Sequence, residues 1–557
     1  MTISSFLLHC VALIKTPDEK QPALTYNIVV KHKERKIMNT AVLFDEVELT
    51  GHDLTLKQLV AVARFYCAVR ISDDALERIK ECRERVDRIT ENDQVAYGIT
   101  TGFGALAKVK VSTEMSKQLS NNLVLSHSVA TGEPYREEQV RGMMLLLVNA
   151  FCHGVSGLRP VVVETYVDML NRNVIPVVPQ KGSLGASGDL APLSHIALVV
   201  LGKGEAFYKG ERMPGARAME LAGIKPLDTL FSKEALAITN GTYAMTAVGA
   251  LNLYDALDLV ATADVTAALS LSALTGQLAA FDQRIHLERG QKGQMKAAEN
   301  ILKLTEGSDM LKDSQGLRVQ DSYSLRCIPQ VHGAIRDALA YVREKTEIEL
   351  NAVTDNPLIF EGDEVISGGN FHGEPMALAY DFMGIALSEV ASISERRTEK
   401  MVNSAISNGL TPFLTVDPGI NSGFMIVQYS AASMVSENKV LAHPASVDSI
   451  PSSANQEDFV SMGTTAARKS GWILENSRSV VAYELLTACQ AIDIRRRIGN
   501  VSPGLSPVLE AVYGLVRKDI DFTETDREIR IDIEKIEKLI RSGKIMETVR
   551  EHIPDFE

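Results

Sequence analysis

The chain has 557 residues, of which 45% are hydrophobic and 23% are charged, and its formal net charge is −13 at pH 7. This composition is typical of a soluble globular protein. The negative charge argues against a nucleic-acid partner, because phosphate binding requires basic patches. The one compact basic run, Arg495-Arg496-Arg497, is typical of a solvated helix end.

Cysteine usage and the first residues bear on location. The six cysteines lack the Cys-x-x-Cys spacing of a zinc site and form no disulfide framework, so a reducing cytoplasm fits best. The apolar stretch Phe6 to Ile14 has neither a basic flank before it nor a small-residue cleavage site after it, which argues against a secretory signal. We treat residues 1–40 as an N-terminal extension of unknown role.

Capping residues predict helices in the N-terminal region, residues 41–240. Asp53 or Thr55 can cap a helix through Ala68, and Ser72 or Asp73 can cap a second helix through Thr90. The glycine-punctuated stretch from Tyr97 to Gly104 is then expected to form a loop. Further helices are expected through Ala150 and, after a break at Gly154 to Pro160, to about Asn171. Short β pieces within residues 203–230 predict a surface hairpin.

The stretch from Lys181 to His195 contains three glycines and the tripeptide Ala186-Ser187-Gly188. If the backbone bends tightly, the amide nitrogen of Gly188 can attack the carbonyl carbon of Ala186. Loss of two waters then leaves a five-membered imidazolone with an exocyclic methylene from Ser187. Such a ring is an electrophile, which none of the twenty side chains is. Glycine suits the ring-closing position because it has no Cβ.

Other interpretations of this stretch fit less well. A serine-hydrolase elbow needs a glycine, and a phosphate-binding loop a lysine, where Asp189 follows Gly188. A plain glycine-rich turn stays open when the stretch is taken alone.

The second half of the chain predicts long helices. Thr242 to Phe281 has no lysine or arginine, and its hydroxyls and Gln277 favour a buried bundle helix over a membrane span. Further helices are expected from Pro375 to Gly409 and within residues 422–442 and 458–497.

These elements predict a mainly α fold. It consists of a long central helix bundle over residues 241–500, a smaller mixed N-terminal region that holds the ring-forming loop, and a C-terminal helical tail over residues 501–557.

Six motifs in order along the chain resemble those of the aromatic amino acid lyases, the histidine and phenylalanine ammonia-lyase family. They are Tyr97–Gly104, Gly182–Ser194, Asn240–Thr242, Gln320–Cys327, Gly368–His372 and Ser453–Asp458. The resemblance covers nearly everything from about residue 40 onward. It implies an ammonia-lyase whose electrophile, 4-methylidene-imidazole-5-one (MIO), forms autocatalytically from Ala186, Ser187 and Gly188, with no external cofactor and no metal.

The resemblance also implies catalytic roles for four side chains. Tyr97 matches the loop tyrosine that acts as base for the β-proton. Asn240 and Tyr323 match residues that hydrogen-bond the ring or the substrate carboxylate and hold the oxygen of the electrophile. Glu457 matches a carboxylate near the substrate amine or side chain; its position also fits an ordinary acid at a helix N-terminus.

Four further matches concern substrate binding. Arg326 matches the arginine that pairs with the substrate carboxylate, for which its planar fork is suited. Gln320 matches a polar contact near the same pocket, and Phe371 matches an aromatic residue beside the ring. His127 matches the histidine that offers a hydrogen bond to a polar substrate ring.

His127, together with Ser436–Lys439 and Gln456–Asp458, resembles the histidine-selective branch, which implies conversion of L-histidine to trans-urocanate. Thr100 and Phe459 depart from that branch, which usually has Asn and His there. A tyrosine ammonia-lyase or an aromatic amino acid 2,3-aminomutase with the same electrophile therefore stays open, as does a helical scaffold that has lost its activity. The family fold implies a homotetramer with shared active sites that acts on a small amino acid, with no nucleic-acid or membrane partner, in the cytoplasm.

Overall fold

The first helices begin where the sequence places capping residues. The computed structural model describes residues 44–92, 96–99, 101 and 113–557; the expectations for residues 1–40, Thr100 and Gly102–Gly104 lie outside these. Thr55 caps α3 (Leu56–Phe65): the Gln58 N–H donates to Thr55 Oγ1 over 3.2 Å. Helix α3 ends before the expected Ala68, because Tyr66 adopts a left-handed φ of 57°. Ser72 caps α4 (Asp73–Glu91), as predicted.

The rest of the N-terminal region is mixed, as expected, and contains the predicted hairpin as β6–β7. Its remaining elements are β1 (Glu46–Leu49), β2 (Ala68–Ile71), α5 (Thr113–His127), β3 (Thr131–Pro134), α6 (Glu137–Phe151), α7 (Pro160–Asn171), β4 (Ile175–Pro176), β5 (Pro179–Lys181), α8 (Leu190–Val200), β6 (Glu205–Tyr208), β7 (Glu211–Pro214), α9 (Gly215–Leu221) and α10 (Glu234–Thr239). The strands form small sheets: β1 pairs with β2 in parallel, β3 with β5 antiparallel, and β4, β6 and β7 form an antiparallel sheet.

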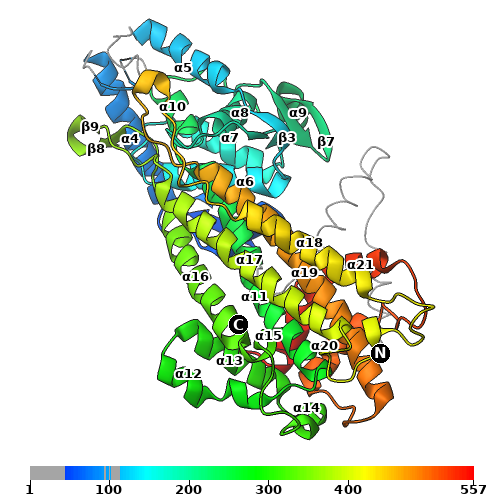
Figure 1. Ribbon diagram of the computed structural model, residues 1–557. Helices are drawn as coiled ribbons and strands as arrows, with labels where there is room; N and C mark the ends of the chain where they lie inside the picture. The colour runs from blue at the N-terminus through cyan, green and yellow to red at the C-terminus, as the bar shows by residue number, and fades with distance from the viewer. Residues whose placement is uncertain (1–43, 93–95, 100, 102–112) are drawn as a thin grey trace, which may run out of the picture. The chain divides into compact units, whose positions relative to one another are not determined.

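Four long helices form the central bundle: α11 (Tyr243–Ala273), α16 (Ile328–Glu349), α17 (Glu374–Val402) and α19 (Gly463–Ile498). Helix α11 packs against the other three and against α6 (Figure 1). Its side chains are buried nearly all round. Its small residues let neighbouring helices approach on every side, so the sequence-based prediction of a central bundle helix is confirmed. In the described part of the chain, α11 and α17 are long and apolar enough to cross a membrane, but 89% and 67% of their most apolar stretches are buried.

Three further predicted helix boundaries were wrong, for local backbone reasons. Helix α11 ends at Ala273 rather than Phe281, and Thr275 just after it adopts a positive φ of 53°. Helix α17 ends at Val402 rather than near Gly409, because the next residue, Asn403, adopts an extended backbone with a ψ of 100°. Helix α19 begins at Gly463 rather than Asp458, because Met462 adopts a left-handed φ of 56°. Residues 457–462 therefore lie outside the helix, where Glu457 and Met462 contact the ring-forming loop.

Shorter elements connect and flank the bundle. They are η3 (Leu278–Phe281), α12 (Gln283–Arg289), α13 (Lys292–Thr305), α14 (Asp309–Ser314), α15 (Tyr323–Arg326), β8 (Leu358–Phe360), η4 (Glu361–Asp363), β9 (Glu364–Ile366), η5 (Pro412–Leu414), α18 (Met425–Leu441), η6 (Ser453–Asn455), α20 (Pro507–Arg517), α21 (Ile529–Arg541) and α22 (Lys544–His552). The described residues, from Phe44 on, form one unit by their contacts. The domain boundaries at 240 and 500 stay predictions. The lower half of Figure 1 shows α12 to α14 near the C-terminal end of α11.

Candidate active site

The ring-forming loop is pressed against the chain segment that follows α10. Gly188 has a φ of +73°, and a Cβ there would lie 2.2 Å from the carbonyl oxygen of Gly241. The Asp189 N–H donates to that same oxygen over 2.7 Å. Asn240 Nδ2 donates to the carbonyl oxygen of Ser187 over 2.5 Å. The backbone is therefore bent tightly at the tripeptide, with no room for any residue but glycine at position 188.

The buried carboxylate of Asp189 joins the ring-forming loop to the helices behind it. Asp189 accepts hydrogen bonds from Ser183 Oγ and the Met245 N–H, both over 2.8 Å, and from Thr464 Oγ1. Burial raises the pKa of Asp189, and these donors act in the opposite direction. Because α8, α11 and α19 all begin around this side chain, their positive N-terminal ends meet beside the loop. Such an arrangement favours negative charge there.

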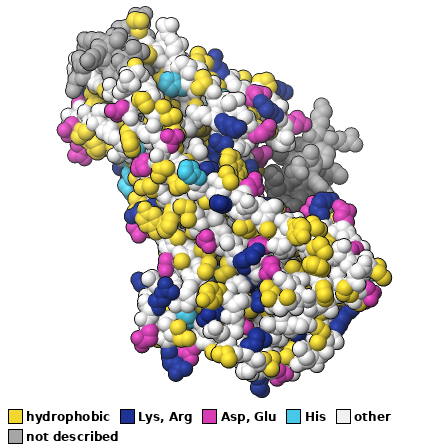
Figure 2. All heavy atoms as spheres, in the orientation of Figure 1, with side chains coloured by type: hydrophobic (Ala, Val, Ile, Leu, Met, Phe, Trp, Pro, Cys, Tyr) yellow, Lys and Arg dark blue, Asp and Glu magenta, His cyan; other side chains and the backbone are white. Residues whose placement is uncertain are grey.

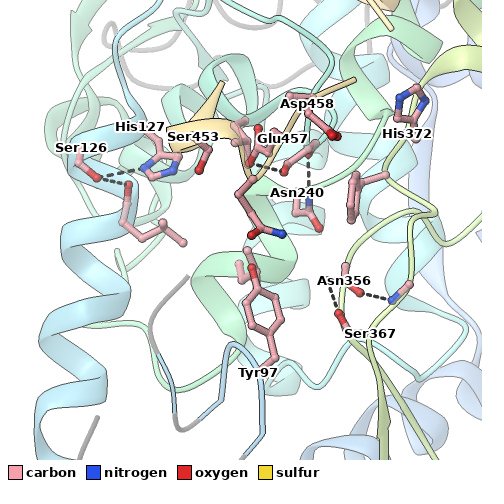
Figure 3. Close-up of a pocket in the computed structure, with 18 of the residues that line it drawn as sticks. Tyr97, Ser126, His127, Asn240, Asn356, Ser367, His372, Ser453, Glu457 and Asp458 are labelled. Carbon is pink, nitrogen blue, oxygen red and sulfur yellow. Dashed lines mark hydrogen bonds between the residues drawn. The ribbon is translucent and has the colours of Figure 1, made fainter. Parts of the chain in front are cut away.

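A cavity of about 800 Å³ opens over Ala186 and Ser187 (Figure 3). Its walls come from α5, the end of α10, residues 356–372 and residues 453–459. The cavity brings together seven predicted site residues, namely Tyr97, His127, Ala186, Ser187, Asn240, Phe371 and Glu457. Their separation in sequence is large, so the fold itself creates this grouping.

Glu457 reaches the tripeptide directly. Ser187 Oγ donates to Glu457 Oε1 over 3.0 Å, and Ser452 Oγ donates to Glu457 Oε2 over 3.3 Å. Glu457 precedes the first turn of α19, which begins at Gly463, so it is not an ordinary acid at the N-terminus of that helix. Its carboxylate is an acceptor aimed at the cavity.

His127 ends α5 and faces the same cavity. Its Nδ1 lies 3.0 Å from Ser126 Oγ. Burial lowers the pKa of His127, which the charge of Glu457 and a backbone hydrogen bond to Leu123 only partly offset. The ring is therefore favoured in its neutral form near neutral pH.

Gln320, Tyr323 and Arg326 do not line this cavity. Tyr323 is 70% exposed, and the Arg326 guanidinium carbon lies 4.6 Å from the centre of the Tyr323 ring. Their segment packs at the C-terminal end of α11, whereas the cavity lies near its N-terminal end. A helix of 31 residues spans about 46 Å. Within one chain, these three residues and the tripeptide are therefore far apart.

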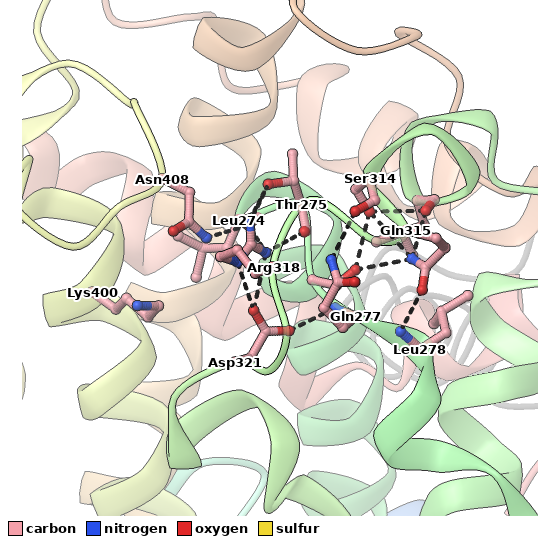
Figure 4. Close-up of polar contacts among 12 residues, drawn as sticks. Leu274, Thr275, Gln277, Leu278, Ser314, Gln315, Arg318, Asp321, Lys400 and Asn408 are labelled. Atoms are coloured by element: carbon pink, nitrogen blue, oxygen red, sulfur yellow. Dashed lines mark hydrogen bonds and ion pairs between the residues drawn. The ribbon is translucent and has the colours of Figure 1, made fainter.

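Hydrogen bonds and an ion pair hold the segment before α15 against the C-terminal end of α11 (Figure 4). Arg318 donates to the carbonyl oxygen of Thr275 over 2.5 Å and forms an ion pair of 3.0 Å with Asp321. The Gln277 N–H donates to the other oxygen of Asp321 over 2.6 Å. A cation at the C-terminal end of α11 complements the helix dipole. We call residues 314–326 the α15 platform.

Several cavity residues were not predicted. Asn122, Ser126, Asn356, His372 and Asp458 also line the cavity. His372 stacks on Phe459 with ring centres 5.8 Å apart. The turn sequence Asp-Asn-Pro could have drawn attention to Asn356. Ser126 adjoins the predicted His127, and His372 lies in the motif Gly368–His372. No local signal marks Asn122.

Residues 54–518 match the model of the family called aromatic amino acid lyase. The chain belongs to that family. An aromatic amino acid lyase is a carbon–nitrogen lyase, and members of the family in general depend on MIO. The geometry at Gly188, where only glycine fits, agrees with what formation of this group requires.

Three family members are similar to this chain over most of its length. A histidine ammonia-lyase of Caldanaerobacter subterraneus subsp. tengcongensis is 54% identical over 91% of this chain and 98% of its own length. The solved structure of histidine ammonia-lyase from Trypanosoma cruzi has a TM-score of 0.85 and 40% identity, covering 92% of this chain and 96% of that chain. The tyrosine aminomutase from Streptomyces globisporus has a TM-score of 0.86 and 35% identity, covering 91% and 98%.

Proposed function

We propose that this lyase eliminates ammonia from L-histidine to give trans-urocanate, with MIO formed from Ala186, Ser187 and Gly188. One observation carries the proposal. The sharply bent tripeptide, the neutral His127 and the Glu457 carboxylate share one cavity. The similarity to proteins named histidine ammonia-lyase supports the substrate.

The residues of the cavity divide the work. When formed, the MIO ring supplies an electrophilic methylene that takes up the substrate amine and makes it a better leaving group. Asn240 already donates to the Ser187 carbonyl oxygen, which suits it to hold the ring oxygen. Tyr97 lines the cavity and is the proposed base for the β-proton.

Ring formation also changes Glu457. Ser187 loses its hydroxyl as water, so Glu457 Oε1 no longer receives the hydrogen bond that it has from Ser187 Oγ. That acceptor then becomes available to an N–H donor of the substrate, either its amine or its ring. A carboxylate acceptor in a partly enclosed site binds such a donor strongly, because the hydrogen bond is charge-assisted.

Gln320, Tyr323 and Arg326 complete the site from another subunit of a homotetramer in this proposal. The exposure of Tyr323 and the distance along α11 support it, since these side chains cannot reach the cavity of their own chain. Arg326 would bind the substrate carboxylate with its planar fork. Cytoplasmic location belongs to the same proposal and agrees with the five described cysteines, all of which are free thiols.

The alternative is a tyrosine ammonia-lyase or an aromatic amino acid 2,3-aminomutase. The Phe459 ring stacked on His372 at the cavity favours it, because this apolar surface replaces a histidine usual in the histidine-selective branch. The likeness to a tyrosine aminomutase supports the same view.

The test is ultraviolet absorbance of the purified protein with L-histidine, L-tyrosine or L-phenylalanine, with Ser187→Ala as the blank. We expect urocanate absorbance to rise with L-histidine and not in the blank. Silence with L-histidine and product with L-tyrosine would replace the proposal by its alternative. The intact mass reports separately whether the tripeptide has lost two waters.

A further inference from the structure

The hydroxyl of Ser126, at the end of α5, contacts two groups (Figure 3). Its Oγ lies 3.2 Å from the carbonyl oxygen of Leu123 and 3.0 Å from His127 Nδ1. A hydroxyl has one proton and two lone pairs. The two contacts can therefore both be hydrogen bonds in only one arrangement.

That arrangement determines the tautomer of His127. The Leu123 oxygen can only accept, so the Ser126 proton points to it. His127 Nδ1 must then carry a proton and donate it to Ser126 Oγ. In the reverse arrangement, Ser126 would donate to Nδ1 and leave two oxygen atoms facing each other without a proton. A neutral imidazole has one N–H, so a protonated Nδ1 leaves Nε2 with a lone pair.

The lone pair on Nε2 can accept a hydrogen bond. In the described part of the chain, the ring contacts Ser126 Oγ through Nδ1 and has a backbone hydrogen bond to Leu123, the residue four positions earlier on the same helix. The ring also lines the cavity over the tripeptide. Burial lowers the pKa of His127, so the neutral ring is the form that a substrate meets near neutral pH.

We infer that Ser126 is a positioning residue that holds His127 in the Nδ1–H tautomer, so that Nε2 accepts a hydrogen bond from the substrate ring. The inference rests on the proposed function and gives its ring contact a direction. The substrate ring must carry a donor, as the N–H of an imidazole or the O–H of a phenol does. A phenyl ring leaves Nε2 unpaired.

The kinetic test compares Ser126→Ala with Ser126→Thr, which keeps the hydroxyl. We expect Ser126→Ala to lower kcat/KM for L-histidine about tenfold, the size of one lost hydrogen bond. Ser126→Thr should recover most of it. Any slow turnover of L-phenylalanine should not fall, because that ring makes no hydrogen bond to Nε2.

A double-mutant cycle separates this role from a merely structural one. If Ser126 acts through His127, then Ser126→Ala should change kcat/KM less than about twofold in a His127→Gln background. Equal effects of Ser126→Ala in both backgrounds would overturn the inference, as would an unchanged kcat/KM in the single variant. The intact mass of each variant verifies that the electrophile is present.

A spectroscopic readout does not depend on the reaction. Solid-state ¹⁵N NMR of histidine-labelled protein distinguishes protonated from unprotonated ring nitrogens, and subtraction of the His127→Gln spectrum isolates one of the eleven histidines. A protonated Nδ1 and a bare Nε2, altered in Ser126→Ala, are expected. A protonated Nε2 would overturn the inference, whether or not the protein turns over L-histidine. Absence of turnover of L-histidine would by itself contradict only the proposed function.

Discussion

The cavity and the α15 platform are built in opposite ways. Around the tripeptide, Asn240 and Glu457 each form a hydrogen bond with Ser187 of the same chain, so the contacts of this half of the site need no second copy. On the platform, Arg318 and Asp321 fix the base, while the Tyr323 side chain stays 70% exposed. The difference teaches that the contacts around the tripeptide form within one chain, whereas Tyr323 on the α15 platform points outward, as the proposed site shared between copies requires.

The largest difference between the cavity and the α15 platform is expected when a glycine in each is replaced by alanine, because the space around the added Cβ differs. Gly188→Ala places a Cβ 2.2 Å from the Gly241 oxygen at a φ of +73°, so we expect no electrophile and a loss of activity to the level of Ser187→Ala. The matched control on the platform is Gly316→Ala, with a φ of +81° but no atom within 4 Å of the added Cβ.

The control should cost about 1 kcal/mol of stability and leave the electrophile intact. Intact mass and the rate of urocanate formation measure both variants. An electrophile formed at normal yield in Gly188→Ala would contradict the view that the tight bend is required.

A smaller effect is expected at the base of the platform. Asp321→Asn keeps one acceptor but removes the charge that pairs with Arg318. Loss of this partly buried charged hydrogen bond corresponds to about 1–2 kcal/mol. If displacement of Arg326 costs that amount of binding energy, kcat/KM for L-histidine should fall about tenfold.

Intact mass should show a normal electrophile in Asp321→Asn, because the cavity is untouched. Glu306→Gln, an exposed acid after α13, is the control and should behave as wild type. A failure of Asp321→Asn to form the electrophile would mean that the two halves are not independent.

The mildest effect concerns pH. Burial lowers the pKa of His127 from its ordinary value of about 6.5, so the folded protein binds that proton less readily than the unfolded chain. Stability should therefore fall as the pH drops below about 6.5, where the unfolded chain begins to bind the proton. The value of kcat/KM should fall only at lower pH, as the lowered pKa of the folded protein is reached. A pH profile of kcat/KM for wild type and His127→Gln checks this. The acid limb should be smaller in the variant, and an identical limb would assign it to another group.

Much of the fold followed from local chemistry. Thr55 and Ser72 cap the first two helices of the described residues, and the lack of lysine and arginine in α11 predicted its burial. The C-terminal end of α17 and the start of α19 were missed, because the backbone angles of Asn403 and Met462 are set by tertiary contacts rather than by local propensity.

The candidate site likewise contains residues that sequence motifs predicted and residues that only the fold revealed. Motif resemblance named Ser187, Asn240 and Glu457, but their direct contacts depend on packing between distant segments. Asn122 and Asn356 were missed, because a lining residue has no mark in the sequence until the fold turns it toward the cavity. The outward placement of Tyr323 is likewise a property of the folded chain.

Complementation between two inactive proteins tests the division of the site most directly. Ser187→Ala and Arg326→Ala should each be inactive alone, and mixed tetramers purified through two different tags should regain activity, because some sites combine an intact cavity with an intact Arg326. The control mixture of Ser187→Ala with Asn240→Ala should stay inactive, since both residues belong to the cavity of one chain. Verified mixed tetramers of the first pair without activity would contradict a site shared between the cavity and the α15 platform.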